Sequence, residues 1–478
     1  MQISLMDGYA REHGKALHFT DGLFFVASQE HAFSVASLIE TLLKWPRTRV
    51  IAGSERRVTT ALRSGSDSAH ERFPPVLVKQ NCLQHSHGKV PFTMTLIPVG
   101  HYQNIKVAGK SVSAFVPEPL PPVLRDQAVE ILADRIDAAE AALVRLVEAA
   151  QLISLPQRII DAFFIKEALA ASAEGGNKAT LTDVLAYELT KQPGSSSTDD
   201  VEDIMNYVAA TQYGLDKLHG EEGRPYFKWL LNECHRILLQ GQRHADQETG
   251  EFRQSQNWIG GQPPGRHTIY VPPAPEHVAR LMDNLEYFLH NDTNLPPLLQ
   301  AATAHAQFEL IHPYLEGNGR IGRMLITCVL NRCERRGGPI LCLSEYFNEN
   351  RADYFFQFGE LQKYGNWYSW FLFFLKGVES VANDAVNTLG QLQSRVHQDR
   401  QKLLVEEGVT VAALRLLELL PENLVVSMPA VRQLLRTTKP TAGKAIEILR
   451  HAGILFEVGK RTRNRAYCYR PYISEGLY

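Results

Sequence analysis

The sequence has few cysteines, no long apolar run and no excess of either charge. Its six cysteines are scattered without a Cys-x-x-Cys pair, which argues against a zinc site or a disulfide framework and predicts reduced thiols in the cytoplasm. No stretch approaches the roughly 18 apolar residues of a membrane span, and the first ten residues lack the segments of a secretory signal. The formal net charge of −2 predicts neither a nucleic-acid coat nor a membrane partner.

The composition that remains is that of an ordinary globular protein. The 478 residues are enough for two to four domains, and the 44% hydrophobic and 21% charged fractions are usual for a soluble protein. Apolar residues recur at helical spacing over 124–155, 156–173, 180–189, 201–218 and 226–240. A mainly α fold is therefore predicted.

The most informative segment is residues 312–323, HPYLEGNGRIGR, which follows an apolar, helix-like stretch at 301–311. Glycines let backbone N–H groups approach phosphate oxygens, and a helix that starts there adds the positive end of its dipole. Arg320 and Arg323 would share one face of that helix, where each could hold phosphate oxygens with two hydrogen bonds. The segment therefore predicts a site for the phosphates of a nucleotide.

The other polar residues of this segment suit chemistry on a phosphate. His312 is uncharged near neutral pH and can act as a base, and Asn318 can donate to developing charge. Glu316 suits Mg2+, a hard cation that takes carboxylate and phosphate oxygens together. The spacing is not that of a Walker P-loop, since no Gly-Lys-Ser/Thr follows. A glycine-rich turn capped by arginines is the alternative interpretation.

The segment resembles the signature of the Fic (filamentation induced by cAMP) family, His-Pro-Phe-x-Asp/Glu-Gly-Asn-Gly-Arg-x-x-Arg, with Tyr314 in place of the Phe that anchors the loop by packing. The resemblance implies transfer of AMP from ATP to a protein hydroxyl, with release of diphosphate. It makes His312 the general base on that hydroxyl and Glu316 the Mg2+ ligand. The residues that it assigns to the nucleotide are Gly317, Asn318 and Gly319 at the α-phosphate, Arg320 and Arg323 at the outer phosphates, and Gly322.

An aromatic-rich segment, 341–358, follows the signature. In Fic proteins the matching segment places an Asn and a Tyr-Tyr pair near the base and ribose, which makes Asn350, Tyr354 and Phe355 the candidates here. Phe355 replaces the second Tyr and lacks its hydroxyl; plain core aromatics are the other interpretation of the pair. His305, two helical turns before the signature, is interpreted as a packed or solvated histidine rather than a metal ligand.

Residues 166–181, KEALAASAEGGNKATL, resemble the N-terminal inhibitory segment of the family, where a glutamate pairs with the second signature arginine, here Arg323. Counting from either end places Gly175 at the glutamate position, which predicts that autoinhibition is lost; Ser172 belongs to the same regulatory segment. Glu174 would then point about 100° away from that position on the helix. An engineered change to Gly, a natural loss, and a shifted register in which Glu174 pairs with Arg323 all remain open.

Residues 251–273 have apolar residues on both sides of a Gly/Pro turn, which indicates a hairpin. Their position before the signature matches the flap of Fic proteins, which holds an extended segment of the target protein by β-strand pairing. A plain loop between two helices is the alternative interpretation.

The C-terminal residues have the order of a winged helix-turn-helix: three helices, a strand, a basic hairpin and a second strand. The basic residues of the third helix and the hairpin could neutralise DNA phosphates, whereas contact with another protein is the alternative. These residues are Lys439, Lys444, Arg450, Arg461, Arg463 and Arg465.

Four regions are predicted. Residues 1–93 are an extension, which is either an over-extended start or a divergent extra domain. Residues 94–200 form an N-terminal helical region with the inhibitory segment, residues 201–385 a Fic catalytic core with its β-hairpin flap, and residues 400–478 the winged helix-turn-helix.

The favoured function is protein adenylylation with Mg2+ and ATP. The acceptor would be a Tyr, Thr or Ser hydroxyl of a target protein, with self-modification and a homodimer as further expectations. One alternative is transfer of UMP, phosphate or phosphocholine, because the signature specifies a diphosphate-containing donor better than its base. The other is a DNA-binding regulator whose core senses a nucleotide.

Overall fold

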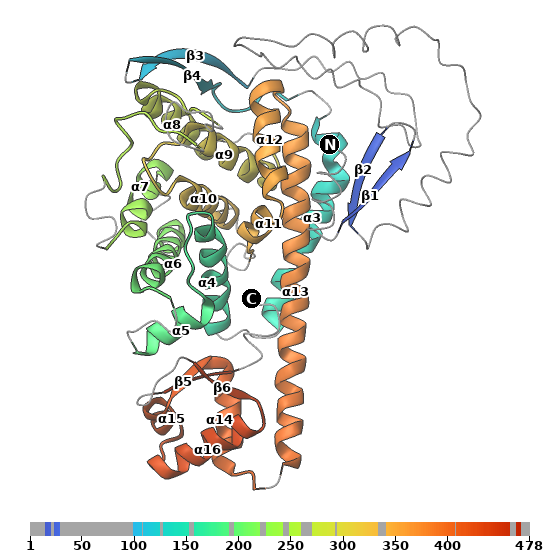
Figure 1. Ribbon diagram of the computed structural model, residues 1–478, viewed down its shortest axis with the longest axis vertical. Helices are drawn as coiled ribbons and strands as arrows, with labels where there is room; N and C mark the ends of the chain where they lie inside the picture. Colours follow the sequence, from blue (N-terminus) through green and yellow to red (C-terminus); the bar gives the residue numbers. More distant parts are fainter. Residues whose placement is uncertain are drawn as a thin grey trace, which may run out of the picture. The chain divides into compact units, whose positions relative to one another are not determined.

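The computed structural model describes part of the 478-residue chain (Figure 1). The described ranges are 15–20, 23–28, 99–107, 109–124, 128–152, 157–190, 196–219, 226–241, 248–259, 270–291, 294–332, 341–406, 408–458 and 465–469. By its internal contacts the chain divides into two units, Met1–Pro91 and Phe92–Tyr478. In the first unit, the described residues form an antiparallel hairpin of β1 (Lys15–Thr20) and β2 (Leu23–Ser28).

The second unit is mainly α-helical, which confirms the predicted fold class. The helices expected from apolar spacing are present with bounds that differ by a few residues. They are α3 (Ala128–Leu152), α4 (Gln157–Ala173), α5 (Leu181–Thr190), α6 (Thr198–His219) and α7 (Phe227–Leu238). Among the described residues, no helix combines the length and apolarity that crossing a membrane requires.

Two adjacent helices, α9 (Pro297–Ile311) and α10 (Asn318–Arg332), lie at the centre of the core. Almost every residue of α9 after its first turn is buried, so this helix is enclosed by the core on nearly all sides. Helix α8 (Pro275–His290) packs on α9, and α6 packs on α10 (Figure 1). The signature loop therefore joins two helices that the surrounding core holds in place.

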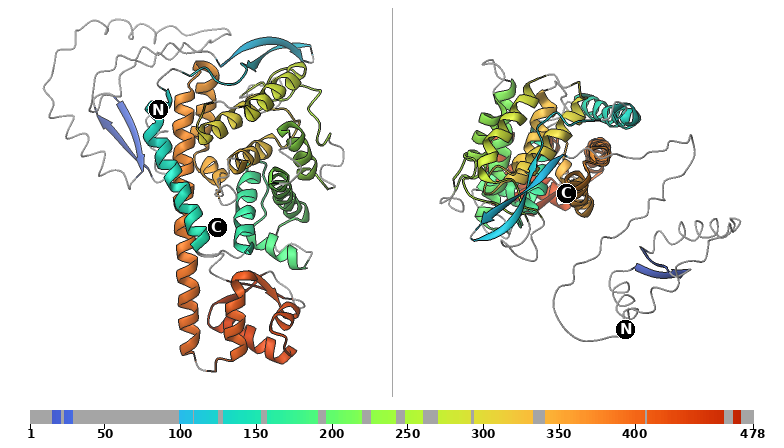
Figure 2. Two further views of the ribbon diagram at one scale, coloured as in Figure 1. Left: turned by 180° about the vertical axis from the view of Figure 1, so that it is seen from behind. Right: turned by 90° about the horizontal axis from the view of Figure 1, so that it is seen from above.

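The aromatic-rich region after the signature forms three helices: α11 (Leu343–Glu349), α12 (Arg351–Tyr364) and α13 (Trp367–Val405). Helix α13 lies alongside α3 in both views (Figure 1, Figure 2). Its first turns bury aromatic residues against α9, where the Trp370 indole donates to Ala302 O at 2.9 Å. This helix of 39 residues was not predicted from the sequence.

Two β features lie beside the core. A hairpin of β3 (Gly100–Val107) and β4 (Lys110–Pro117) packs on α9, and Phe115 N donates to Val271 O at 2.9 Å. Within 251–273, Ile259 and Tyr270 form an antiparallel bridge, as a hairpin requires. The turn at 260–269 lies outside the described residues.

The C-terminal elements are α14 (Val411–Leu419), η4 (Leu420–Glu422), β5 (Val425–Ser427), α15 (Met428–Leu435), α16 (Lys439–His451), β6 (Leu455–Val458) and β7 (Ala466–Tyr469). The three helices and the two later strands have the predicted order. The short strand β5 was not predicted; it pairs with β7 in an antiparallel sheet of order β5-β7-β6. Arg461 and Arg463 lie outside the described residues.

Candidate functional site

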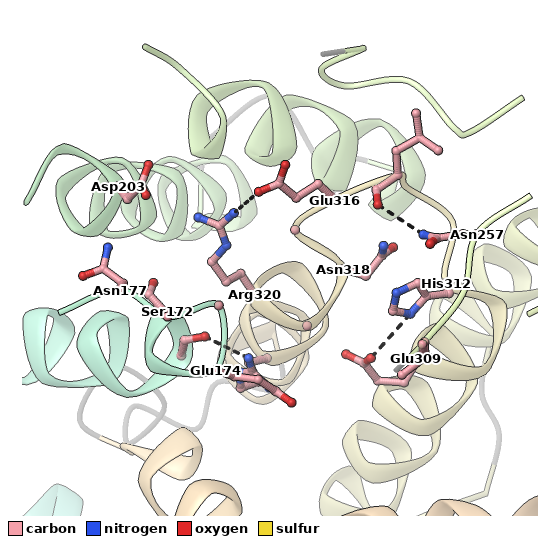
Figure 3. A pocket seen from close by; sticks show the side chains of 18 of the residues that line it. Ser172, Glu174, Asn177, Asp203, Asn257, Glu309, His312, Glu316, Asn318 and Arg320 are labelled. Atoms are coloured by element: carbon pink, nitrogen blue, oxygen red, sulfur yellow. Dashed lines mark hydrogen bonds and ion pairs between the residues drawn. The ribbon is translucent and has the colours of Figure 1, made fainter. Parts of the chain in front are cut away.

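The signature lines a cavity of about 670 Å3 (Figure 3). Five parts of the second unit meet there: the end of α4, one residue of α6, residues 257–259, the loop between α9 and α10, and the start of α12. The signature residues that line it are His312, Leu315, Glu316, Gly317, Asn318, Gly319, Arg320 and Arg323, together with Ser172, Glu174 and Gly175 of the predicted regulatory segment. The fold thus brings together residues about 140 positions apart in the sequence.

His312 ends α9 in a strained backbone conformation. Its φ of +51° is left-handed, which is uncommon for a residue with a side chain, and its N–H still donates to Phe308 O at 2.8 Å. The chain therefore turns sharply at His312 and leaves the axis of α9. This turn directs the imidazole into the cavity (Figure 3).

Arg253, which was not predicted as a site residue, stabilises this turn by hydrogen bonds to backbone carbonyls. Its side chain is 1% exposed, and its guanidinium donates to His312 O at 2.8 Å and to Pro273 O at 2.6 Å. Its backbone N–H donates to Pro313 O at 2.9 Å. Burial lowers the pKa of Arg253 to about 10, so the group remains a cation at neutral pH. One buried cation therefore fixes the end of α9, the start of the signature loop and the strand after the flap turn.

The imidazole of His312 faces a carboxyl group, Glu309, from the preceding turn of α9 (Figure 3). His312 Nδ1 lies 3.8 Å from Glu309 Oε2. Burial and the nearby Arg253 lower the pKa of His312 to about 3, although the Glu309 carbonyl partly offsets them. Burial also raises the pKa of Glu309 to about 7. A neutral imidazole is the form that can accept a proton.

The signature loop is tied together by Asn318. Its Oδ1 accepts from Tyr314 N at 2.9 Å, and its Nδ2 donates to Tyr314 O at 2.7 Å. The predicted anchoring role of Tyr314 is confirmed, because this ring is fully buried and stacks on His235 at 3.9 Å. Asn318 therefore shapes the loop, and its amide has one further N–H hydrogen for a phosphate oxygen.

His235, on α7, supports the next part of the loop. Gly250 N donates to its Nδ1 at 2.8 Å, so Nε2 carries the proton and donates to Glu316 O at 3.0 Å. Burial lowers the pKa of His235 to about 4, which keeps this tautomer neutral. Gly317 follows with a φ of +78°, a conformation that glycine adopts without strain. Helix α10 then begins at Asn318, as predicted, with its N-terminal N–H groups at the cavity.

Glu316 and Arg320 line the cavity next to the N-terminus of α10. Arg320 Nη2 is 3.7 Å from Glu316 Oε1, and the Glu316 side chain is 43% exposed, whereas that of Arg320 is 13% exposed. Asp203, from α6, also lines the cavity and interacts electrostatically with Arg320. Oxygen donors of this kind fit Mg2+, which usually takes one or two carboxylates and completes its shell with waters and substrate phosphates.

Arg323 is more deeply buried than Arg320 and lies near the carboxylate of Glu174. Its Nη2 donates to Ala171 O at 2.9 Å, and its Nη1 lies 3.7 Å from Glu174 Oε2. The other oxygen of Glu174 is 3.0 Å from Arg351 Nη2, and Arg351 lies over the Phe355 ring. Two arginines from different helices therefore hold the Glu174 carboxylate at the cavity.

This geometry corrects the expectation that Glu174 points away from Arg323 and agrees with the shifted register that the sequence left open. Helix α4 ends at Ala173, and residues 174–176 form a turn in which Gly175 N donates to Ser172 O at 3.1 Å. The expected rotation of 100° per residue applies only within a helix, so it does not hold in this turn. The carboxylate of Glu174 consequently reaches Arg323 from one residue earlier than the count predicted.

Two predicted nucleotide residues do not line the cavity. Asn350 donates from Nδ2 to Tyr346 O at 2.9 Å, at the junction of α11 and α12. Gly322 faces α9, where a side chain would collide with Glu309 and Phe308. Its position is required for close packing of the two central helices. Both residues lie outside the lining of this cavity, and their assignment to the nucleotide stays a prediction.

Tyr354 and Phe355 satisfy both interpretations that the sequence left open. Both line the cavity, yet Tyr354 is buried and its hydroxyl lies 3.0 Å from His305 Nε2. His305 Nδ1 lies 2.9 Å from Gly322 O, so Nδ1 donates and Nε2 accepts from Tyr354. The prediction of a packed histidine at 305 is confirmed.

Besides His235, four residues that shape the site were not predicted from the sequence: Asp203, Asn257, Glu309 and Arg253. Asn257 Nδ2 donates to Tyr314 O at 2.9 Å and so links the flap segment to the signature loop. Of these four, only Glu309 could have been predicted from the sequence. It lies three positions before His312, and residues at this spacing share one face of a helix. The others come from distant segments that only folding brings together.

Comparisons with known proteins place two family domains in the second unit. The Fic/DOC family matches residues 228–330, and the Fic/DOC family N-terminal domain matches residues 133–216. The chain is 39% identical over 103 residues to the protein adenylyltransferase Fic of Drosophila grimshawi, which is 21% of this chain and 19% of that protein. It is 31% identical over 201 residues to the protein adenylyltransferase Fic of Drosophila willistoni, 41% of this chain and 37% of that protein.

The matched regions thus span less than two fifths of the length of these relatives. Among solved structures, a Fic family protein from Desulfovibrio desulfuricans G20 is similar at 20% identity and a TM-score of 0.47, over 73% of this chain and 98% of that one. Residues 312–323 overlap the Fic/DOC match, and the end of α4 lies within the N-terminal match. Both matched domains therefore contribute to the cavity, and Tyr354 and Phe355 complete its lining from outside the matches.

Proposed function

The chain belongs to the Fic/DOC family, and on this premise we propose that it is a protein adenylyltransferase that moves AMP from ATP to a protein hydroxyl. One observation carries the proposal: a single cavity holds a neutral histidine, a glycine-rich helix start and two arginines. A base, a phosphate cradle and two cations are the parts that nucleotidyl transfer needs.

In the proposed reaction, the target hydroxyl oxygen attacks the α-phosphorus while the bond to the leaving diphosphate breaks. His312 takes the hydroxyl proton, and the diphosphate leaves with the bonding electron pair. Backbone N–H groups at the start of α10, with the amide of Asn318, hold the α-phosphate. Arg320 and Arg323 hold the outer phosphates, where their charge offsets the negative charge that develops on the leaving group. Arg253 holds the backbone of His312 in position.

Mg2+ would supply charge neutralisation on the phosphates, and Glu316 would hold it. The Glu316 carboxylate is the exposed acid of the signature loop, beside Arg320. Asp203 lines the same side of the cavity and adds negative charge near the proposed cation. The Glu316 carbonyl is fixed by His235, so the backbone that carries the carboxylate is rigid.

We further propose that Glu174 inhibits the enzyme. Its carboxylate lies near Arg323, where the γ-phosphate would otherwise bind. A bound carboxylate neutralises Arg323 and repels an incoming phosphate, so ATP binds productively only when Glu174 leaves. Arg351 offers an alternative partner for the displaced carboxylate. The enzyme is therefore restrained rather than permanently active.

The proposal is tested by incubating the protein with Mg2+ and ATP labelled at either the α- or the γ-phosphate. Label from the α-phosphate, and not from the γ-phosphate, should enter protein, and mass spectrometry should find AMP on a Tyr, Thr or Ser of the chain itself. Incorporation of γ-label would favour phosphate transfer instead. Parallel reactions with UTP and CDP-choline test UMP and phosphocholine transfer, because Tyr354 and Phe355 offer a stacking surface without specifying one base.

A second candidate function, DNA binding, rests on one surface of the C-terminal region. Helices α15 and α16 are joined by a three-residue turn, as in a helix-turn-helix. Arg450 and Arg465, two of the cations that the sequence predicts to contact DNA, form ion pairs with Glu447 and Glu457. Four other cations form what we call the basic face: Arg432, Arg436, Lys439 and Lys444 are all exposed, and no acidic residue occurs between 428 and 446.

We propose that the basic face binds the phosphates of duplex DNA. None of its four cations lies within ion-pair distance of a described carboxylate, so each is available to a phosphate. Replacing all four by Ala should remove most of the salt-dependent affinity for a labelled duplex. The matched control replaces Lys106, Lys110, Arg135 and Lys376, which are also exposed and carry the same total charge. Equal affinity of the two variants would contradict the proposal.

A further inference from the structure

The carboxyl group of Glu309 lies in the floor of the cavity and is not explained by the packing of α9. Its side chain is 12% exposed, and its Oε1 has no hydrogen-bond partner among the described residues. Buried carboxyl oxygens usually have such a partner, because a buried acceptor without one has lost its hydrogen bonds to water and gained none in return. An unpartnered buried oxygen that lines a reaction cavity indicates a functional role.

The atom that faces this carboxyl group is also without a partner. His312 Nδ1 is buried, makes no hydrogen bond within the described part of the chain, and lies 3.8 Å from Glu309 Oε2. A shortening of less than 1 Å would give an ordinary hydrogen bond. Distances of this kind are often long before substrate binds and shorten in the reacting complex.

Other charged groups also face Glu309 and limit its possible partners. Arg323 approaches from α10, Glu174 from the turn after α4, and the Tyr354 hydroxyl from α12. Arg323 stabilises the ionised form of Glu309, whereas Glu174 opposes it. The absence of a side chain at Gly322 leaves the space that Glu309 occupies. Removal of Glu174 from Arg323, as productive ATP binding requires, therefore also removes a charge that disfavours the Glu309 carboxylate.

We propose that Glu309 is the positioning residue of His312: its carboxylate accepts the Nδ1 proton and leaves Nε2 as the base toward the target hydroxyl. This inference rests on the proposed nucleotidyl transfer. The hydroxyl proton passes to Nε2 as the oxygen–phosphorus bond forms and the diphosphate leaves. The resulting imidazolium keeps its Nδ1 proton, which the Glu309 carboxylate stabilises without taking it. The imidazolium then loses the Nε2 proton to water.

This arrangement follows the logic of other activated bases, in which an acid orients a histidine through the nitrogen that does not react. It also explains how a buried imidazole near Arg253 gains basicity during the reaction. Its competitor is the Glu309 backbone carbonyl, which also lies near the ring. Substitution of the side chain leaves that carbonyl in place, so the two partners can be separated.

The test uses the full chain in a Glu174→Ala background. Glu309→Gln keeps the size of the side chain and removes its charge. We expect kcat to fall by roughly 10- to 100-fold, within the range for acid–base groups, while the Kd for ATP changes less than about threefold. The parent Glu174→Ala protein should also show an acidic limb in its pH profile, which reports the ionisation of Glu309, and the Glu309→Gln variant should lose that limb.

The matched control is Glu167→Gln. Glu167 is also a buried carboxyl group near Arg323, and burial raises its pKa to about 7, but its side chain contacts Ser344 rather than His312. This variant should keep the acidic limb. An unchanged kcat in Glu309→Gln, or loss of the limb in both variants, would overturn the assignment.

A readout that does not depend on turnover separates this inference from the proposed activity. In protein labelled with 15N-histidine, the His312 signals should report a proton on Nδ1 and a pKa that falls when Glu309 becomes Gln, because the carboxylate stabilises the imidazolium. His312→Asn identifies the signals. If the chain transfers no nucleotide, this titration still tests the pairing; an unchanged His312 pKa would refute it.

Discussion

The arginines of the cavity and the cations of the basic face are similar side chains in opposite settings. Arg323 is 5% exposed and lies near the Glu174 carboxylate, whereas the four cations of the basic face are exposed and lack carboxylate partners. A buried cation has already lost its water and needs a counter-charge, so a ligand must replace a carboxylate to bind it. An exposed cation can bind an anion by releasing salt ions. Under the two proposals, the same residue type would provide regulated binding in one region and salt-dependent binding in the other.

The largest expected effect tests the chemistry of the buried region. His312→Asn removes the base but tolerates the left-handed backbone at this position. Transfer of AMP should fall by about 10²- to 10⁴-fold, because general base catalysis is lost, while ATP affinity measured by calorimetry should persist. Near-normal turnover would show that His312 is not the base.

The second prediction contrasts the salt dependence of the two regions. Raising salt from about 50 to 200 mM should weaken DNA binding by the basic face roughly 100-fold, as expected for about four neutralised phosphates. ATP binding to the enclosed cavity should weaken far less, because buried pairs are poorly screened. Fluorescence anisotropy with labelled DNA and a labelled ATP analogue measures both. Similar salt slopes for the two ligands would remove the contrast.

The third prediction concerns the counter-charge. Glu174→Ala should raise the rate of AMP transfer by roughly tenfold or more, because Arg323 becomes available to the γ-phosphate. Gly175→Glu serves as the control: its side chain has room, with Ser172 O at 3.4 Å, but starts one residue beyond the contact. Initial rates of label incorporation measure both variants. If Glu174→Ala left the rate unchanged and Gly175→Glu lowered it, position 175 and not Glu174 would be the inhibitory position.

The smallest effect is on stability and follows from burial alone. Burial raises the pKa of Glu167 to about 7, from 4.5 for an exposed glutamate. Its contribution to stability is therefore fully present below pH 4.5 and is lost as pH rises toward 7, because the unfolded chain releases its proton first. The loss is of the order of 3 kcal/mol. Glu167→Gln should lessen the fall in unfolding free energy between pH 5 and 8, measured with urea; an identical pH dependence would contradict this.

The helices and the signature could be predicted because their causes are local. Apolar spacing indicated α3 to α7, and the glycines and arginines of 312–323 indicated a phosphate site at a helix start. The long helix α13 was missed, although its dense aromatic start packs against α9. Strand β5 was missed because three residues carry too little pattern, and its partner β7 lies about 40 residues later.

The sequence by itself determined which chemical groups this protein carries and their order, since motif, spacing and helix periodicity are properties of neighbouring residues. Tertiary structure alone decided which groups meet. Arg253 reaches the carbonyl of His312 across 59 positions, and Glu174 meets Arg323 because α4 ends one residue too early for the helical count to hold. Contacts between distant segments depend on where each helix ends and how it packs. Helical periodicity relates side chains only within one helix, so it does not predict the relative direction of side chains on either side of a turn.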